Sequence, residues 1–410
     1  MSICVVSDFL PGLHTTWGGA EIACLRILRL LRSRGERVLL LTTEPTEKGA
    51  HVPCDLHVLP TYRRYVGQHI DFELKNLIPL DALAHREARR VFRKFRPRVV
   101  HLQRASQMSL SVVQAAWELG IPVVFSLYDL WTLCPLCSLL RPDGRLCTRY
   151  HGAHCVDCLH VLKKPLVLFR KSIFDRMLPK IDRFICLSQT VVGQLADYGI
   201  PRAKLATLPL PLFDSIQMAP DGRLDHSILF AGWVAATKGL HVLVEALPAV
   251  IGEYPDVRLS VIETGAVEPY KGDLTRRIAD LGLTRHVHFL GKHSPVDVKH
   301  LLSRAGMVAV PEQWGIAWPI FLTEAMAYAR PIVASRVGDI PRFIRDGRTG
   351  YLADRDSPEA FAHAILRIFR NGEHALALGR AARTFILEMC DEDRIATQLL
   401  SYYRFTETAA

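Results

Sequence analysis

The sequence predicts an α/β protein with two doubly wound parallel sheets, and three observations lead to this. Short apolar runs recur along the chain with amphipathic stretches between them. Such runs, bounded by turn residues, are typical of strands buried on both faces of a parallel sheet. The pattern restarts near residue 226, after a stiff connector, Leu208-Pro209-Leu210-Pro211-Leu212, in which each proline fixes its own φ. The length of 410 residues also suits two domains of ordinary size.

Each half of the chain is expected to supply five buried strands. An amphipathic helix is predicted for residues 21–34, where leucine and isoleucine alternate with arginine at helical spacing. Alternation of strands and helices produces parallel sheets with crossover helices, and ligands bind such sheets beyond the carboxyl ends of their strands. The predicted strands are 3–7, 38–42, 99–102, 123–127 and 184–187, followed by 228–231, 259–262, 287–290, 307–310 and 331–335.

Composition excludes several classes of protein. With 49% hydrophobic and 22% charged residues, the chain is not disordered, collagenous or of low complexity. Residues 1–210 carry 29 Lys and Arg against 17 Asp and Glu, whereas the remainder carries 22 and 24. The whole positive excess therefore lies in the first half, which indicates that one domain faces an anionic partner; solvated basic helix faces are the alternative. The absence of a nucleic-acid-binding motif argues against DNA or RNA as that partner.

The N-terminus lacks the basic stretch and the long apolar run of a signal peptide. The chain also contains no run of about 18 apolar residues, the length needed to span a membrane. We expect a cytoplasmic protein, and any membrane contact is expected to be peripheral, on the inner face. The basic and apolar stretch 161–174 is the candidate for contact with an anionic membrane; an ordinary amphipathic helix is the alternative.

In each half of the chain, a glycine-containing turn follows the first predicted strand. Gly18-Gly19-Ala20-Glu21 opens a helix, where glycines allow close approach of a ligand to the backbone and the helix N-terminus favours an anion. In the second half, the segment from Gly232 to Lys238-Gly239 leads into a helix near Leu240, and the Lys238 ammonium is suited to neutralising a diphosphate. A tight strand-to-helix turn and an exposed surface lysine are the respective alternatives.

The most specific segment runs from Val310 to Ala327 and places Glu324 among apolar neighbours on a helix. A carboxylate in such a place accepts hydrogen bonds from vicinal hydroxyls, as on a ribose. Further along the chain come Gly338-Asp339-Ile340-Pro341 and Asp346-Gly347-Arg348-Thr349-Gly350.

In this order and at these separations, the three segments resemble those of glycosyltransferase family four, the retaining enzymes of GT-B fold, over nearly the whole chain. The resemblance implies two Rossmann-like domains facing a central cleft: an acceptor-binding domain over 1–212, a nucleotide-sugar-binding domain over 213–390, and a final helix in 391–410 that crosses back to the first domain. No catalytic metal is expected.

Residue roles follow from the resemblance. Lys238 would contact the donor diphosphate, Glu324 the ribose hydroxyls, and Asp129 is a possible acceptor-side group whose alternative is a loop cap. Together these three are the candidate catalytic residues. The candidate donor-binding residues are Gly18, Gly19, Gly232, Trp233, Lys238, Ile316, Trp318, Pro319, Ile320 and Glu324.

Three positions depart from the family's pattern. Trp233 stands where the family usually has Arg, and Ile316 replaces the first of two glutamates spaced eight apart. The usual His-Asp pair reads Tyr128-Asp129. An apolar Ile316 favours a less polar donor sugar, such as a deoxy sugar. The reaction that the resemblance implies is hexosyl or deoxyhexosyl transfer from a nucleotide-diphosphate sugar to a glycan or lipid-linked acceptor in polysaccharide or glycoconjugate biosynthesis. The alternative is a degenerate GT-B protein that binds a nucleotide or sugar as a scaffold.

Five of the ten cysteines fall within an insertion, 134–158, and two pairs have the two-residue gap of thiolate metal sites. Structural zinc is the favoured prediction; a disulfide pair, free thiols or an iron–sulfur cluster are the alternatives. His151, His154 and His160 are additional candidates. The predicted ligands are Cys134, Cys147, Cys155 and Cys158, with Cys137 as an alternate.

Overall fold

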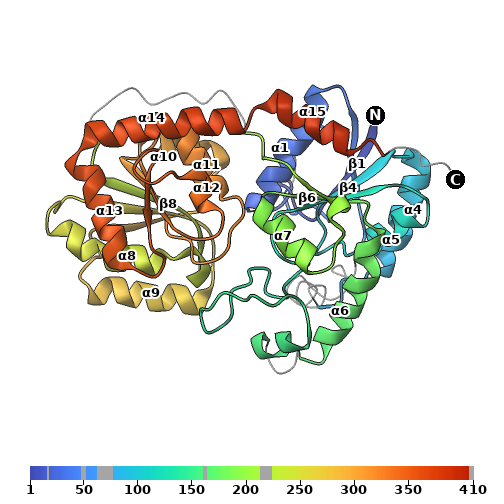
Figure 1. Ribbon diagram of the computed structural model, residues 1–410, viewed down its shortest axis with the longest axis horizontal. Coiled ribbons are helices and arrows are strands. Elements are labelled where there is room, and N and C mark those ends of the chain that lie inside the picture. The colour runs from blue at the N-terminus through green and yellow to red at the C-terminus, as the bar shows by residue number, and fades with distance from the viewer. Residues whose placement is uncertain (16–17, 48–51, 62–76, 160–163, 213–223, 406–410) are drawn as a thin grey trace. The chain divides into compact units, whose positions relative to one another are not determined.

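The computed structural model describes residues 1–15, 18–47, 52–61, 77–159, 164–212 and 224–405. It divides into two compact units, Met1–Pro211 together with the segment that begins at Asp391, and Leu212–Cys390 (Figure 1). Each unit is a parallel sheet with helices on both faces, so the predicted α/β fold class is confirmed.

The first unit contains a seven-stranded sheet in the order β3-β2-β1-β4-β5-β6-β7. Helices α1 and α15 lie on one side of this sheet and α4, α5 and α6 on the other (Figure 1). The strands are β1 (Ser2–Ser7), β2 (Arg37–Thr42), β3 (Asp55–Val58), β4 (Val99–Arg104), β5 (Val123–Leu127), β6 (Arg183–Cys186) and β7 (Leu205–Thr207). The helices are α1 (Gly19–Ser33), α4 (Ala82–Phe95), α5 (Ser111–Trp117), α6 (Leu166–Met177), α7 (Gln189–Asp197) and α15 (Glu392–Tyr402).

The second unit contains a six-stranded sheet in the order β10-β9-β8-β11-β12-β13. Helix α8 packs against α13, and α11 packs against α14 on the other side of the sheet. The strands are β8 (Ser227–Val234), β9 (Arg258–Ala266), β10 (Val287–Gly291), β11 (Met307–Val310), β12 (Ile332–Ser335) and β13 (Tyr351–Ala353). The helices are α8 (Leu240–Ile251), α9 (Glu268–Asp280), α10 (Pro295–Arg304), α11 (Ile320–Ala327), α12 (Ile340–Phe343), α13 (Pro358–Arg370) and α14 (Gly372–Met389).

The order of the strands reverses once in each sheet, between β1 and β4 in the first unit and between β8 and β11 in the second. In doubly wound sheets, the crevice at such a switch point, beyond the carboxyl ends of the strands, is where ligands bind. The residues that follow β4 and β8 are therefore the first places to look for a functional site.

All ten predicted strands are present, and the structure adds three that the sequence analysis did not predict, β3, β7 and β13. Each of these three lies at an edge of its sheet. The second unit also corrects one boundary. Gly232 and Trp233, predicted to lie in a turn, belong to β8, which continues to Val234 through an irregularity in its pairing with β9.

Helix α15 packs against α1 and belongs to the first unit. Its last turn is fixed to the sheet, because the hydroxyl of Tyr402 donates to the carbonyl of Thr207 at 2.9 Å. Arg183 donates to the carbonyl of Tyr402 at 3.2 Å. The last five residues, 406–410, which the sequence analysis assigned to the same segment, lie outside the described residues.

Candidate functional site

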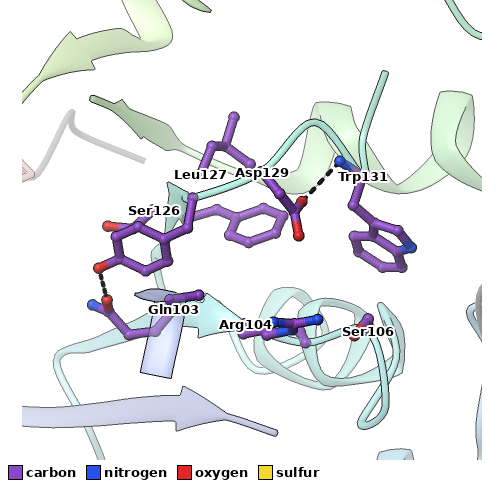
Figure 2. Close-up of a pocket in the computed structure, with 11 residues that line it drawn as sticks. Gln103, Arg104, Ser106, Ser126, Leu127, Asp129 and Trp131 are labelled. Carbon is purple, nitrogen blue, oxygen red and sulfur yellow. Dashed lines mark hydrogen bonds between the residues drawn. The ribbon is translucent and has the colours of Figure 1, made fainter. Parts of the chain in front are cut away.

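A pocket in the first unit opens at the switch point of its sheet. Its cavity of about 20 Å³ opens to solvent at the carboxyl ends of β4 and β5, beside the first turn of α1 (Figure 2). Polar side chains converge there from two segments, the end of β4 with its following loop and the end of β5 with its following loop. The lining residues are Ala20, Gln103, Arg104, Ala105, Ser106, Phe125, Ser126, Leu127, Tyr128, Asp129 and Trp131.

Asp129 lies at one wall of this pocket, just beyond β5. Its Oδ1 accepts a hydrogen bond from the backbone N–H of Trp131 at 2.8 Å, which turns the chain away from the sheet. Burial raises the pKa of Asp129, although the nearby Arg104 opposes that shift. The carboxyl group of Asp129 can therefore cap the loop through Oδ1, as predicted, and still face a ligand in the pocket.

Arg104, the last residue of β4, forms an ion pair with the buried Glu21 of α1 at 2.9 Å. The other oxygen of Glu21 accepts the backbone N–H of Gly18 at 2.7 Å, so the glutamate also caps its own helix. Glu21 raises the pKa of Arg104, which stays fully charged. The Nε atom of Arg104 is buried and has no hydrogen-bond partner among the described residues. The side chain as a whole is 29% exposed, so a ligand in the pocket would reach the guanidinium at its terminal nitrogens.

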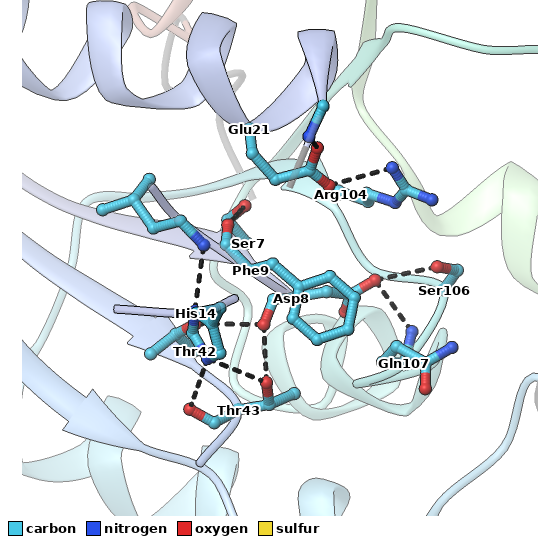
Figure 3. Close-up of polar contacts among 12 residues, drawn as sticks. Ser7, Asp8, Phe9, His14, Glu21, Thr42, Thr43, Arg104, Ser106 and Gln107 are labelled. Carbon is cyan, nitrogen blue, oxygen red and sulfur yellow. Dashed lines mark hydrogen bonds and ion pairs between the residues drawn. The ribbon is translucent and has the colours of Figure 1, made fainter. Parts of the chain in front are cut away.

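The loop after β4 is held by Asp8, which follows β1. The carboxylate of Asp8 accepts hydrogen bonds from the hydroxyl of Ser106 at 2.8 Å and from the backbone N–H groups of Gln107 and Met108 at 2.8 and 2.9 Å (Figure 3). The Asp8 carbonyl accepts from the hydroxyl of Thr43 at 2.6 Å. These bonds fix the floor of the pocket against the central strands.

A buried polar network lies beneath the same pocket. His101 of β4 contacts the hydroxyl of Tyr403 at 2.5 Å and the hydroxyl of Ser126 at 2.8 Å. Burial lowers the pKa of His101 to about 3, so the imidazole is neutral. Tyr128 donates to the side-chain oxygen of Gln103 in the same region. Tyr403, just after α15, is thus linked through His101 to Ser126, which lines the pocket.

In the second unit, the corresponding switch point carries Lys238, which closes a short helical turn before α8. Its ammonium forms an ion pair with Glu312 Oε1 at 2.6 Å, and Glu312 follows β11. The second oxygen of Glu312 accepts the indole N–H of Trp314 at 2.7 Å. The ammonium also lies 5.5 Å from the centre of the Trp314 ring, within the range of a cation–π interaction.

Backbone contacts hold these two loops together. Gly239 has a φ of +68°, and a Cβ atom there would lie 1.7 Å from the carbonyl oxygen of Pro311, so only glycine fits. The N–H of Gln313 donates to the carbonyl of Thr237 at 2.9 Å. The turn after β8 and the turn after β11 therefore form one rigid corner at the carboxyl end of the sheet.

The remaining predicted donor residues lie on the following loop and on α11. Ile316 is buried, and its carbonyl accepts the N–H of Asp339 at 3.0 Å. Trp318 packs edge-on against Phe343 with ring centres 4.9 Å apart, and its indole N–H has no partner within the described part of the chain. Pro319 caps α11, which begins at Ile320 and carries the half-buried Glu324.

Trp233 is 42% exposed at the end of β8. Its ring lies against Gly265 of β9, where a Cβ atom would approach the indole to 2.9 Å. The glycine therefore makes room for the indole that replaces the usual arginine. Gly232 lies beside the side chain of Lys238: a Cβ atom added at Gly232 would lie 3.8 Å from Lys238 Cδ.

The structure thus brings Gly232, Lys238 and the loop after β11 together in the second unit, and connects Gly18 through Glu21 and Arg104 to the pocket of Asp129 in the first. The sequence analysis did not assign roles to Glu312, Arg104 or Asp8. All three lie within two residues of the end of a predicted strand, but the strand order that brings these ends together at a switch point is not visible in the sequence.

All ten cysteines are free thiols, the five in the cysteine-rich insertion and the five elsewhere. Burial raises the pKa of Cys155, and the neighbouring thiols of Cys134, Cys158 and Cys147 raise it further. His151 contacts the buried Arg170 at 3.0 Å. No group of three or more His, Cys, Asp or Glu residues in the described ranges has a geometry that could hold a metal ion. His160 lies outside those ranges.

The described helices include none that is long and apolar enough to cross a bilayer. The predicted membrane-facing stretch 161–174 is described only from residue 164 onward. There, Leu168 and Phe169 of α6 are 59% and 50% exposed, while Val167 and Arg170 are buried.

Comparison with known proteins agrees with this architecture. Residues 17–212 match the family model of Glycosyltransferase Family 4, and residues 224–385 match that of Glycosyl transferases group 1. The fold is that of the GT-B glycosyltransferases. The chain belongs to glycosyltransferase family four, which confirms the resemblance seen in its sequence.

Solved structures share the fold over almost the full chain. HepE of Anabaena, in complex with UDP and glucose, superposes with a TM-score of 0.71 at 17% identity and covers 97% of this chain and 98% of that one. Sucrose-phosphate synthase from Thermosynechococcus elongatus gives a TM-score of 0.73 at 17% identity, with 98% of each chain covered.

Curated relatives match over shorter stretches. Phosphatidyl-myo-inositol mannosyltransferase of Mycobacterium leprae is 30% identical over 204 residues, 48% of this chain and 52% of the relative. D-inositol 3-phosphate glycosyltransferase of Corynebacterium kroppenstedtii is 23% identical over 329 residues, 74% of this chain and 69% of the relative. The chain thus spans about half the length of the first of these relatives.

Proposed function

We propose that the protein is a retaining glycosyltransferase that moves a sugar from a nucleotide-diphosphate sugar to a glycan or lipid-linked acceptor in polysaccharide or glycoconjugate biosynthesis. The observation that carries this proposal is the position of Lys238, at the switch point of the second sheet beside the loop that leads to Glu324. Relatives named as mannosyl- and glycosyltransferases, and a neighbour solved with UDP and glucose, support it.

In this proposal the second unit, Leu212–Cys390, binds the donor. Lys238 balances the charge that develops on the departing diphosphate, and Glu324 accepts hydrogen bonds from the ribose hydroxyls. The acceptor hydroxyl attacks from the same face as the leaving group, and its proton passes to the departing phosphate. The protein therefore supplies charge and orientation, and no side chain acts as a nucleophile.

The first unit binds the acceptor. Its pocket places the guanidinium of Arg104, which is paired with Glu21, beside the carboxyl group of Asp129. This arrangement suits an acceptor that offers a hydroxyl near an anionic group such as a phosphate. The excess of positive charge in residues 1–210 has the sign that would attract such an anionic group.

The test is release of nucleoside diphosphate from a panel of nucleotide sugars by the full chain, with the product's anomeric configuration read by NMR. Retention of configuration and loss of release in Lys238→Ala are expected. Inversion of configuration would refute the retaining mechanism.

A non-catalytic scaffold that binds a nucleotide or sugar is the second candidate. Trp233 in place of the family's arginine and Ile316 in place of its first glutamate favour it, because each removes a polar contact to the donor. Nucleotide binding without release from any nucleotide sugar would select this candidate.

We also propose that Cys134, Cys147, Cys155 and Cys158 hold a structural zinc ion, with Cys137 as an alternate. Proximity supports their grouping, because the thiols of Cys134, Cys158 and Cys147 each raise the pKa of Cys155. The four do not form a group with metal-binding geometry in the described chain, so the ion would have to draw them together. Zinc-bound thiolates would tie together a loop that has little core of its own. Metal analysis of protein purified without added zinc tests this: about one zinc per chain is expected, and a folded, metal-free protein would refute it.

For location, we propose a cytoplasmic protein that touches the inner face of the membrane at its periphery. The exposed Leu168 and Phe169 on α6, close to the exposed Lys164, support this contact. Flotation with vesicles tests it, and binding that is indifferent to anionic lipid would contradict it.

A further inference from the structure

Glu312 is a buried carboxylate that the proposed reaction does not use. Its side chain is 8% exposed, and both of its oxygens are engaged, one by the ammonium of Lys238 at 2.6 Å and one by the indole N–H of Trp314 at 2.7 Å. It lies in the loop directly after β11, across the switch point from Lys238. Two hydrogen bonds and burial leave this carboxylate little freedom to move away.

The ion pair changes the charge that a ligand meets. Lys238 is 23% exposed along its side chain, so a ligand can reach it, but Glu312 already cancels its charge. Trp233, on the strand that precedes Lys238, contributes no second cation. A diphosphate that binds Lys238 must therefore share the ammonium with a fixed negative charge a few ångströms away.

We infer that Glu312 is a specificity-determining residue that makes the site bind a nucleotide sugar in preference to the free nucleoside diphosphate. This inference rests on the proposed donor site. A nucleoside diphosphate has a terminal phosphate whose second ionisation is close to neutral pH, whereas in a nucleotide sugar that phosphate is esterified and carries one charge fewer. Repulsion by a fixed carboxylate grows with the charge of the ligand. Glu312 therefore weakens product binding more than donor binding and favours product release.

The experiment is calorimetric titration of the full chain and of Glu312→Gln with UDP, GDP and ADP and with the corresponding nucleotide-glucose of each. The amide keeps the size of the side chain and the bond from Lys238 but removes the charge. We expect the variant to bind the nucleoside diphosphate about tenfold more tightly, and to gain only about threefold for the nucleotide sugar.

Two control variants separate charge from packing. Trp314→Phe removes the indole bond and keeps the carboxylate, so the preference for the nucleotide sugar should remain within about twofold of the original. Glu253→Gln removes an exposed carboxylate that pairs with Arg370 beyond the C-terminal end of α8, and should change neither affinity. Glu312→Ser gives a second uncharged variant if the amide does not fold.

The outcomes distinguish the inference from the function on which it rests. Equal or weaker binding of the nucleoside diphosphate by both uncharged variants would overturn the inference while leaving the donor site in place, and would make Glu312 a positioning residue for Lys238. Failure of every nucleotide and nucleotide sugar to bind the unmodified chain would refute the donor site itself.

Discussion

Arg104 at the end of β4 lies 2.9 Å from the carboxylate of Glu21, the residue that also caps the first turn of α1. One buried carboxylate thus joins the glycine-rich turn after β1 to the pocket at the end of β4. Glu21 is almost fully buried, and its two oxygens are both engaged.

Replacing Glu21 by alanine should destabilise the first unit by about 3 kcal/mol, because it leaves the charge of Arg104 without its partner and the helix without its cap. Urea unfolding followed by circular dichroism measures the change. The exposed pair of Arg276 and Asp273 provides the control: Asp273→Ala should shift the unfolding free energy by less than about 0.5 kcal/mol. A Glu21→Ala effect as small as the control would contradict this account of the ion pair.

Gly239 is predicted to tolerate no side chain. Gly239→Ala should cost more than about 2 kcal/mol, because the positive φ is strained for alanine and the methyl group would collide with the carbonyl of Pro311. At Gly193, inside α7, an added methyl group would meet nothing within 4 Å, so Gly193→Ala should stabilise the chain by roughly 0.5–1 kcal/mol. Paired thermal unfolding curves of the two variants would show shifts of opposite sign; a tolerated alanine at 239 would refute the close approach of the two loops.

Stability should fall in acid because of His101. Its pKa is lowered to about 3 in the folded chain, whereas an unfolded histidine titrates near 6.5. Between these two values the unfolded chain binds the extra proton, so the free energy of unfolding decreases as the pH falls, by up to about 1.4 kcal/mol per pH unit from this group. Above pH 6.5 the contribution is complete and the slope from His101 vanishes.

His151 has a pKa lowered to about 3 by burial and by Arg170, and it adds to the same acid slope. Denaturant titrations between about pH 4 and 7 therefore compare the unmodified chain with His101→Gln, which cannot titrate. The variant should lose a large part of the slope and retain the part due to His151. An unchanged slope would show that His101 is not held neutral in the folded chain.

Asp129→Asn tests the acceptor side of the proposed function. The amide oxygen still accepts the N–H of Trp131, so the turn beyond β5 should persist. Removing the carboxyl group opposite Arg104 should lower transfer to the acceptor by roughly 10–100-fold, while donor binding in the second unit stays unchanged. A variant with unaltered transfer would limit Asp129 to the capping role that the sequence also allowed.

The buried framework was predictable because its strands are continuous apolar runs. Strands such as Val123–Leu127 and Met307–Val310 have the predicted bounds, since helices cover both faces of the sheet there. The strands that were missed are short edge strands. Asp55–Val58 has partly exposed residues of mixed polarity, and Leu205–Thr207 has only three residues, so neither gives an apolar run.

The candidate site was predictable where it depends on backbone geometry and not where it depends on pairing across the sheet. Gly18 and Lys238 could be found because a glycine turn or a cation at a strand end is a local signal. The partners Glu312 and Arg104 could not, because β8 and β11 become neighbours only through the strand order, as do β1 and β4. The extension of β8 through Trp233 likewise depends on pairing with β9.

The central claim is that Lys238 holds the diphosphate of a nucleotide-sugar donor, and donor turnover tests it most directly. The measurement is release of nucleoside diphosphate from each of a panel of nucleotide sugars, compared between the full chain and Lys238→Ala. The account predicts release from at least one donor, reduced by about 100-fold or more in the variant because a charge that stabilises the leaving group is lost. Release that is unaffected in Lys238→Ala, or no release from any donor by the unmodified chain, would contradict it.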